Sequence, residues 1–167
     1  MSELTKMAND DQDIRTRLAA SGAADTVLGK EMLALDSAHT RMLRELLHGR
    51  AWFDETELKK RDRISAFMLL QHSPDTAMQA AALPVLKKQA SKLGPQANQM
   101  VALLEDRVLV EEGKPQIYGT QVSIDHGSLI VYPIADSVNV DSRRSSIGLQ
   151  SLSAYLDMLR SMIPKTN

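Results

Sequence analysis

A histidine placed directly after an apolar run is the side chain in this sequence best suited to acid–base chemistry. His72 follows Gln71 and the segment AFMLL, and it precedes Ser73-Pro74-Asp75. An unperturbed imidazole titrates near neutral pH, so His72 could act as a general acid or base. We expect Asp75 to be among the substrate-binding residues and to orient His72 or stabilise its cation. The alternative for this segment is a histidine that caps a helix by bonding to a backbone carbonyl.

A second polar segment, GKPQIYGTQ, covers residues 113–121. The alternation of a strand would place Gln116 and Tyr118 on one face, and Gly119 would allow a bulge or a close backbone approach. Amide and phenol groups gathered in this way suit a polar ligand. We expect Tyr118 and Gln121 to be catalytic, by orienting the substrate or polarising a carbonyl, and Gln116 to bind substrate. The alternative is a polar network that fastens a hairpin to helices.

Arginines in two further motifs are candidates for holding an anionic group. Arg107 lies in E-D-R-V, and Arg143 and Arg144 end V-D-S-R-R. Adjacent helical residues point about 100° apart, so only one of the pair can serve a given face. We expect Arg107 or Arg143 to bind a carboxylate or another anion of the substrate. Of the adjacent pair Arg143 and Arg144, the one that does not bind the anion would pair with Asp136 or Glu105.

Near the N-terminus, Asp11 and Arg15 are four residues apart and therefore share one helix face. We expect Gln12 and Arg15 to contribute to substrate binding, with Asp11 in support. The alternative is a surface ion pair, which would contribute only a few tenths of a kcal/mol, about 0.3.

Several kinds of chemistry are excluded or disfavoured by residues that the sequence lacks. The chain has no cysteine, which excludes thiolate metal sites, iron–sulfur clusters and a cysteine nucleophile. It has no G-x-S-x-G, H-E-x-x-H or G-x-G-x-x-G motif. We expect no metal and no cofactor. The remaining histidines are expected to be solvated surface residues: His39, His48 and His126.

The composition indicates a globular protein that does not bind nucleic acid. Lys and Arg number 20 against 21 Asp and Glu, and aromatic residues make up 4% of the 167 residues. Neutralisation of phosphates needs a basic excess, and base stacking needs aromatic side chains. No secretory leader or membrane-spanning apolar run is recognisable. We expect a cytoplasmic protein with a small polar molecule or a peptide as its partner, and we leave its oligomeric state open.

Hydrophobic periodicity predicts a mainly α fold, a helical bundle of about six helices with one β-hairpin inserted before the C-terminal helix. The expected organisation is a single domain over residues 1–167. It consists of a helical part at 4–110, a hairpin at 115–134 and a C-terminal helical part at 138–163. The expected strands are Gln116–Ile124 and Leu129–Ile134, joined by a turn at 125–128. Ser73 and Pro74 are the expected N-cap and first residue of a helix.

Four motifs together carry a family resemblance. In chain order they are D-Q-x-x-R from Asp11, Q-H at Gln71, D-R-V…Y-G-T-Q ending at Gln121, and V-D-x-R-R ending at Arg144. The chain resembles, over about residues 8–156, an uncharacterised bacterial family catalogued as a domain of unknown function. The resemblance implies that these polar residues form one shared site. The sequence departs from the family pattern at Pro74, which stands where the pattern has an acid.

Three functional hypotheses follow. The first is an enzyme, or an enzyme-like pocket, for a small polar metabolite or peptide, with His72 as general acid/base. The second is a non-catalytic binding or interaction protein of an accessory or immunity type. The third is that the polar motifs are purely architectural and fix a hairpin onto a helical bundle.

Overall fold

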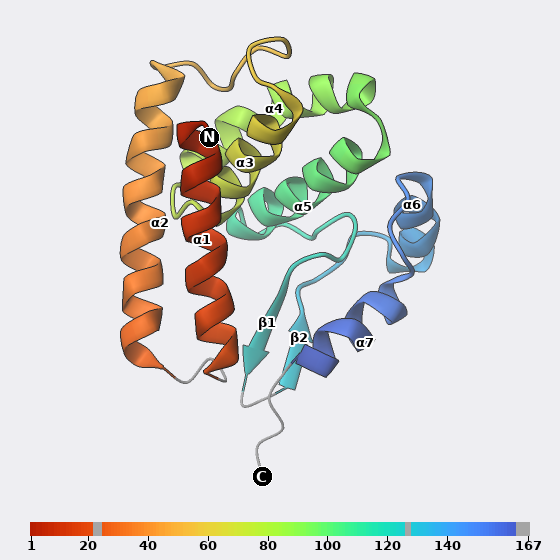
Figure 1. Ribbon diagram of the computed structural model, residues 1–167. Coiled ribbons are helices and arrows are strands. Elements are labelled where there is room, and N and C mark those ends of the chain that lie inside the picture. The colour runs from red at the N-terminus through yellow and green to blue at the C-terminus, as the bar shows by residue number, and fades with distance from the viewer. Residues whose placement is uncertain (22–24, 126–127, 163–167) are drawn as a thin grey trace. The chain divides into compact units, whose positions relative to one another are not determined.

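The computed structural model describes residues 1–21, 25–125 and 128–162, and it confirms a mainly helical fold with one hairpin before the C-terminal helix (Figure 1). The chain divides into two compact units, Met1–Val85 and Leu86–Asn167. The α-helices of the described chain are α1 (Glu3–Ala20), α2 (Thr26–Leu47), α3 (Lys60–His72), α4 (Thr76–Leu93), α5 (Pro95–Glu111), α6 (Val140–Ser146) and α7 (Leu152–Met162).

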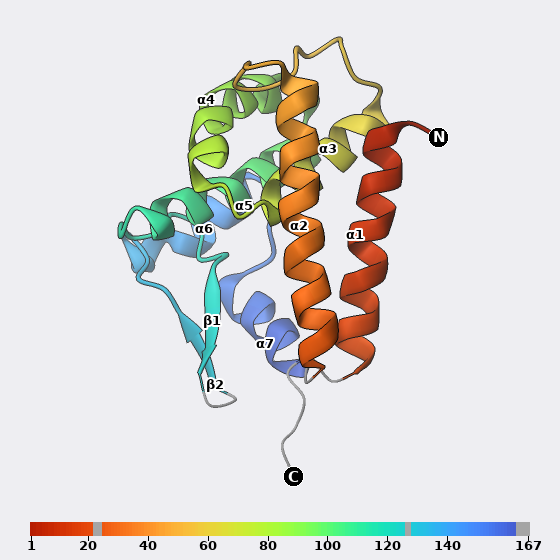
Figure 2. The same ribbon diagram turned by 90° about the vertical axis from the view of Figure 1, so that its left-hand side faces the viewer.

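The first unit is built on α1, α2 and α3, which pack against one another. α1 and α2 lie side by side and run in opposite directions in both ribbon views (Figures 1 and 2). Each begins at a side-chain cap, since Ser2 accepts the amide of Thr5 and Asp25 accepts the amides of Val27 and Leu28. These caps satisfy amides that have no partner within the helix.

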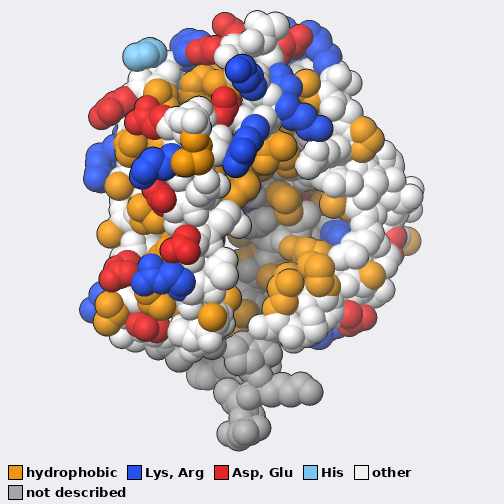
Figure 3. Space-filling view, in the orientation of Figure 1, with side chains coloured by type: hydrophobic (Ala, Val, Ile, Leu, Met, Phe, Trp, Pro, Cys, Tyr) orange, Lys and Arg blue, Asp and Glu red, His pale blue; other side chains and the backbone are white. Residues whose placement is uncertain are grey.

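The core of the first unit follows from the apolar stripes of its helices. Leu43 and Leu70 are fully buried, and Met7 and Leu47 are each 2% exposed. Burial of a leucine side chain contributes about 1.5–3 kcal/mol, so these residues hold the three helices together. On the face of α1 and α2 seen in Figure 3, acidic and basic side chains are interspersed with hydrophobic ones.

The second unit combines α5, a two-stranded antiparallel hairpin, the 3₁₀-helix η1 (Ser137–Asn139), α6 and α7. The strands are β1 (Val122–Asp125) and β2 (Ser128–Val131), and Val122 pairs with Val131. α4 crosses the boundary between the units, and Pro84 lies inside it. Proline removes one helical hydrogen bond at that point.

The predicted strand bounds are wrong, because both observed strands have only four residues. Residues 116–121 form a loop, and Gly119 has a φ of +71° that strand geometry does not permit. Gln116 keeps a single backbone bridge, to Ile134. The predicted placing of Gln116 and Tyr118 on one strand face is therefore also wrong. Two residues of the predicted turn, 126 and 127, lie outside the described part of the chain.

The predicted helix start at Ser73-Pro74 is two residues too early. α4 begins at Thr76, and the Asp75 carboxylate accepts the amide of Met78. The Ser73 hydroxyl instead accepts the amide of Asp75. Aspartate therefore takes the capping role that we assigned to serine.

The prediction that His39 is a surface residue is wrong. His39 lies in α2 and is 5% exposed, and its Nδ1 atom is buried without a hydrogen-bond partner among the described residues. Burial lowers the pKa of His39 below 6.5, and the negative charges of Asp11 and Asp10 oppose this shift without cancelling it. His48 is exposed, as expected, and ends α2 in a left-handed conformation. His126 is among the residues that the structure does not describe.

We predict that the first unit becomes less stable as the pH falls below 6.5. The unfolded chain protonates His39 at its ordinary pKa, whereas the buried ring takes up a proton only at lower pH. Replacement by leucine, His39→Leu, removes the group and should flatten this part of the stability profile. Urea unfolding at a series of pH values, followed by the fluorescence of the sole tryptophan, Trp52, measures it.

His48→Gln is the matched control for that series, because His48 is exposed. Its profile should retain the wild-type slope below pH 6.5. Equal slopes for wild type and His39→Leu would contradict the prediction.

Candidate functional site

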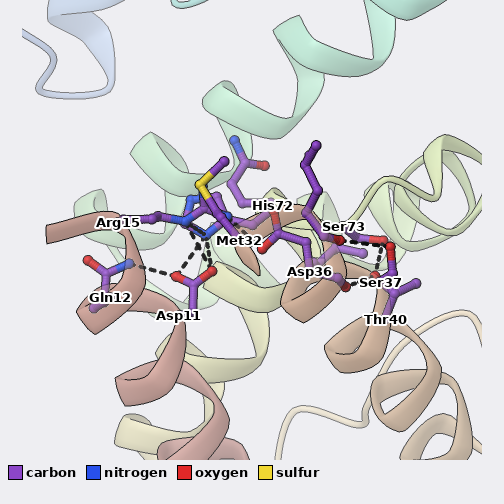
Figure 4. Close-up of polar contacts among 12 residues, drawn as sticks. Asp11, Gln12, Arg15, Met32, Asp36, Ser37, Thr40, His72 and Ser73 are labelled. Atoms are coloured by element: carbon purple, nitrogen blue, oxygen red, sulfur yellow. Dashed lines mark hydrogen bonds and ion pairs between the residues drawn. The ribbon is translucent and has the colours of Figure 1, made fainter. Parts of the chain in front are cut away.

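A buried carboxylate in α1 organises the polar centre of the first unit. Asp11 is 0% exposed. Both of its oxygens lie 2.9 Å from the Nδ1 atom of His72, at the C-terminal end of α3. The same carboxylate accepts hydrogen bonds from Arg15 Nε at 3.1 Å and from Gln12 Nε2 at 2.8 Å (Figure 4). The structure thus brings together three predicted site residues from segments about sixty residues apart.

The proton positions in this cluster follow from its donors and acceptors. Nδ1 of His72 also lies 3.1 Å from the Nε atom of Arg15, which is always a donor. Nδ1 cannot both accept from Arg15 and donate to Asp11. The carboxylate is the stronger acceptor, so Nδ1 carries a proton and Arg15 donates to Asp11. In the neutral ring, Nε2 then bears the lone pair.

Arg15 extends the cluster to α2. Its Nη2 atom donates to Asp36 Oδ1 at 2.7 Å, and its Nη1 atom lies 3.2 Å from Met32 Sδ. Asp36 is 8% exposed, and sequence analysis missed it. A signal was present, since Asp36, His39 and Thr40 fill the buried helical positions between the apolar residues Met32 and Leu43. Polar residues on the buried stripe of a helix need partners from another element.

The two carboxylates that flank Arg15 have opposite pKa shifts. Burial acts to raise the pKa of Asp11, but hydrogen bonds from His72 and Gln12 and the charges of His72 and Arg15 together bring it below 3.8. Burial raises the pKa of Asp36 above 3.8, although its ion pair with Arg15 acts against this. Asp11 therefore remains the permanent negative charge beside His72.

Asp75, the partner that we predicted for His72, serves elsewhere. Its carboxylate caps α4 and forms an ion pair with Arg44. The neighbouring Ser73 hydroxyl accepts a hydrogen bond from Thr40 at 2.9 Å. The residues that follow His72 thus fix the junction of α3 and α4, while Asp11 orients the imidazole.

A second buried carboxylate, Asp106 in α5, organises the polar centre of the second unit. It is 0% exposed and accepts the amides of Ile117, Tyr118 and Thr120 at 2.7–3.2 Å. The Thr120 hydroxyl donates to it at 2.9 Å. Three amides can meet one carboxylate because the chain turns at Gly119, where an added Cβ would lie 2.9 Å from side-chain atoms of neighbouring residues.

The two glutamines of this loop bind the backbone. The Gln116 side chain is 0% exposed, donates to the carbonyls of Gln121 and Tyr132, and accepts the amide of Gln121. The Gln121 side chain donates to the carbonyl of Leu103 and to the Thr120 hydroxyl. These bonds hold the loop to α5 and to the hairpin.

The adjacent arginines point to different partners, as their spacing predicts. Arg143 donates to the carbonyls of Ile117, Ala135 and Asp136, and it pairs with the Asp136 carboxylate at 3.3 Å. Arg144 is 1% exposed, donates to the carbonyls of Tyr118 and Gln150, and lies 5.0 Å from the centre of the Tyr155 ring. Both guanidinium groups thus bind the loop that Asp106 organises.

Of the remaining predicted site residues, Tyr118 and Arg107 are half-buried in the second unit. Burial raises the pKa of Tyr118, and the negative charge of Glu105 adds to this shift. The phenol is therefore protonated at neutral pH and can act as a donor. The predicted site residues fall into two groups, with Gln12, Arg15, His72 and Asp75 in the first unit and Arg107, Gln116, Tyr118, Gln121 and Arg143 in the second.

Within the described chain, no three histidine, aspartate or glutamate side chains form a group that could hold a metal ion. No helix of that part of the chain combines the length and the apolar character needed to cross a bilayer.

Comparison with known proteins assigns the chain to a family. Residues 1–164 match the family described as Family of unknown function (DUF6624), and the chain belongs to it. No curated protein and no solved structure matches the chain.

We predict that Asp106→Ala destabilises the second unit by roughly 3 kcal/mol or more, because three amides lose their buried acceptor. Amide hydrogen exchange at residues 117, 118 and 120 should become faster, which hydrogen-exchange mass spectrometry measures. Asp157→Ala is the matched control, since the Asp157 side chain is 71% exposed and forms a surface ion pair with Arg160. Unchanged protection of the loop in Asp106→Ala would refute this role.

Proposed function

We propose that this protein is an enzyme that acts on a small polar metabolite or a peptide, with His72 as its general acid/base. The observation that carries the proposal is the contact between His72 Nδ1 and the buried carboxylate of Asp11 at 2.9 Å. A carboxylate in this position fixes the tautomer of an imidazole and stabilises its protonated form. The imidazole side chain is 28% exposed, which leaves it in contact with solvent.

The proposed proton path uses the two ring nitrogens for different tasks. Nδ1 keeps its proton and donates it to Asp11 in a hydrogen bond. Nε2 accepts a proton from a substrate hydroxyl or a bound water as the new bond forms, and Asp11 compensates the charge of the imidazolium. Nε2 then returns the proton to the leaving group. Arg15 and Gln12 hold Asp11 in place throughout, because each donates to one of its oxygens.

Catalytic roles for Tyr118 and Gln121 receive less support from their contacts. The side-chain amide of Gln121 donates to Leu103 and Thr120, and the Tyr118 amide donates to Asp106. Such bonds favour an architectural task for the loop. We therefore place the chemistry on His72.

A non-catalytic binding protein is the second candidate, and the hairpin favours it. Ile124 is 61% exposed and pairs across the hairpin with the half-buried Leu129, so these two apolar side chains share one face that reaches solvent. Exposed apolar residues that lie together are typical of surfaces that contact other proteins. In this case His72 would be a structural tie between α3 and α1.

The first proposal predicts that His72→Gln lowers turnover by about 10²- to 10⁴-fold. Hydrolysis of p-nitrophenyl acetate and of a panel of dipeptide amides provides the assay for wild type and variant. Asp11→Asn should lower the same rate, because the amide cannot compensate the imidazolium charge. Trp52 fluorescence establishes that each variant is folded.

His48→Gln is the control for these rates, since His48 is exposed at the end of α2 and has no role in the proposed proton path. It should turn over each probe at the wild-type rate. A folded His72→Gln variant with wild-type turnover of every probe that the protein hydrolyses would remove His72 from the mechanism. Hydrolysis of no probe by the wild type would favour the binding protein.

A further inference from the structure

We infer that the site at His72 takes a substrate group that is uncharged or positively charged, and that Arg15 is a positioning residue instead of a ligand for an anion. This inference deepens the proposed function and rests on it, because it concerns the group that reaches His72. It reverses the role that the sequence predicts for Arg15, which was substrate binding.

The guanidinium of Arg15 is already engaged at all three nitrogens. Nε donates to Asp11 at 3.1 Å, Nη2 donates to Asp36 at 2.7 Å, and Nη1 lies 3.2 Å from the Met32 sulfur. These contacts use three of the five N–H groups of the guanidinium. An anion that bound the two remaining N–H groups, on Nη1 and Nη2, would lie close to the buried Asp36 carboxylate, whose charge repels it.

The charges around His72 do not cancel. Asp11 and Asp36 carry two negative charges, and Arg15 carries one positive charge. Neighbouring charged groups of α1 form pairs of their own, Lys6 with Asp10 and Asp13 with Arg17. With neutral His72, the cluster therefore keeps one negative charge. This charge repels an anion that approaches the His72 ring.

The three helices of the first unit supply one member of this cluster each, besides Asp11. Arg15 comes from α1, Asp36 from α2 and His72 from α3, and Figure 4 shows them converging on one point. The Arg15 guanidinium donates to Asp11 and to Asp36, and these two contacts fix its position. The guanidinium thus acts on the reaction through Asp11, which it holds against His72.

Alkylation of His72 by two reagents of similar shape tests the inference. Iodoacetamide is neutral and iodoacetate is anionic. In both reactions the lone pair of an imidazole nitrogen displaces iodide, a nitrogen–carbon bond forms, and the ring proton is released to solvent. Mass spectrometry of the intact protein and of its peptides gives the rates at His72 and at exposed His48, which serves as internal reference.

In the wild type, we expect iodoacetamide to be favoured over iodoacetate at His72 by about threefold or more relative to His48. Asp36→Asn removes one negative charge and should reduce this preference. Arg15→Gln removes the positive charge and should increase it. High salt should weaken the preference in every protein, because mobile ions screen the charge.

Asp13→Asn is the matched control. Like Asp36→Asn, it removes one negative charge from the first unit. The Asp13 side chain, in α1, is 69% exposed. Its preference at His72 should equal that of the wild type.

Equal or faster reaction with iodoacetate at His72, or an unchanged preference in Asp36→Asn, overturns the inference. So does a His72 that neither reagent alkylates, since no substrate could then reach the ring. The expected preference together with undiminished turnover in His72→Gln would preserve the charge selection and remove the proposed catalysis. Loss of turnover in His72→Gln, with no preference between the two reagents at His72, would preserve the proposed catalysis and remove the charge selection.

Discussion

The buried carboxylate of Asp11 is the contact on which the polar centre of the first unit depends. An ionised carboxylate removed from water must be surrounded by donors, and unpaired burial costs several kcal/mol, of the order of 3–5. Asp11 meets this requirement with donors from His72, Arg15 and Gln12. Arg15 in turn donates to Asp36, so one position in α2 must carry an acceptor. One buried charge thereby specifies side chains on three helices.

The second unit uses the same device for a different purpose. Asp106 is equally buried, but its donors are three backbone amides and a hydroxyl. Those donors do not exchange protons at neutral pH. The role of Asp106 is therefore to hold the loop in place. One donor to Asp11 is an imidazole, which can exchange a proton through its other nitrogen. This difference in donors, and not in the carboxylate, separates an architectural site from a candidate catalytic one.

Arginine use follows the same distinction. Arg143 and Arg144 direct their guanidinium groups to backbone carbonyls, and Arg15 directs its own to two carboxylates. A motif rich in arginine and glutamine suggests the recognition of an external anion, yet these groups bind parts of their own unit. His72 is the member of the motifs whose partly exposed ring combines a fixed proton on one nitrogen with a lone pair on the other.

The sequence by itself determined the mainly helical fold, the hairpin before the last helix and the acid–base candidate His72, because apolar periodicity and residue chemistry are local properties. It also identified Asp11 and Arg15 as neighbours on one helix face. Only the tertiary structure decided that Asp11 instead of Asp75 orients His72, that Asp36 joins the cluster and that His39 is buried. Each of these depends on which helix faces meet. The loop at residues 116–121 was misread as a strand for the same reason, since the acceptor of its amides, Asp106, lies on a different element.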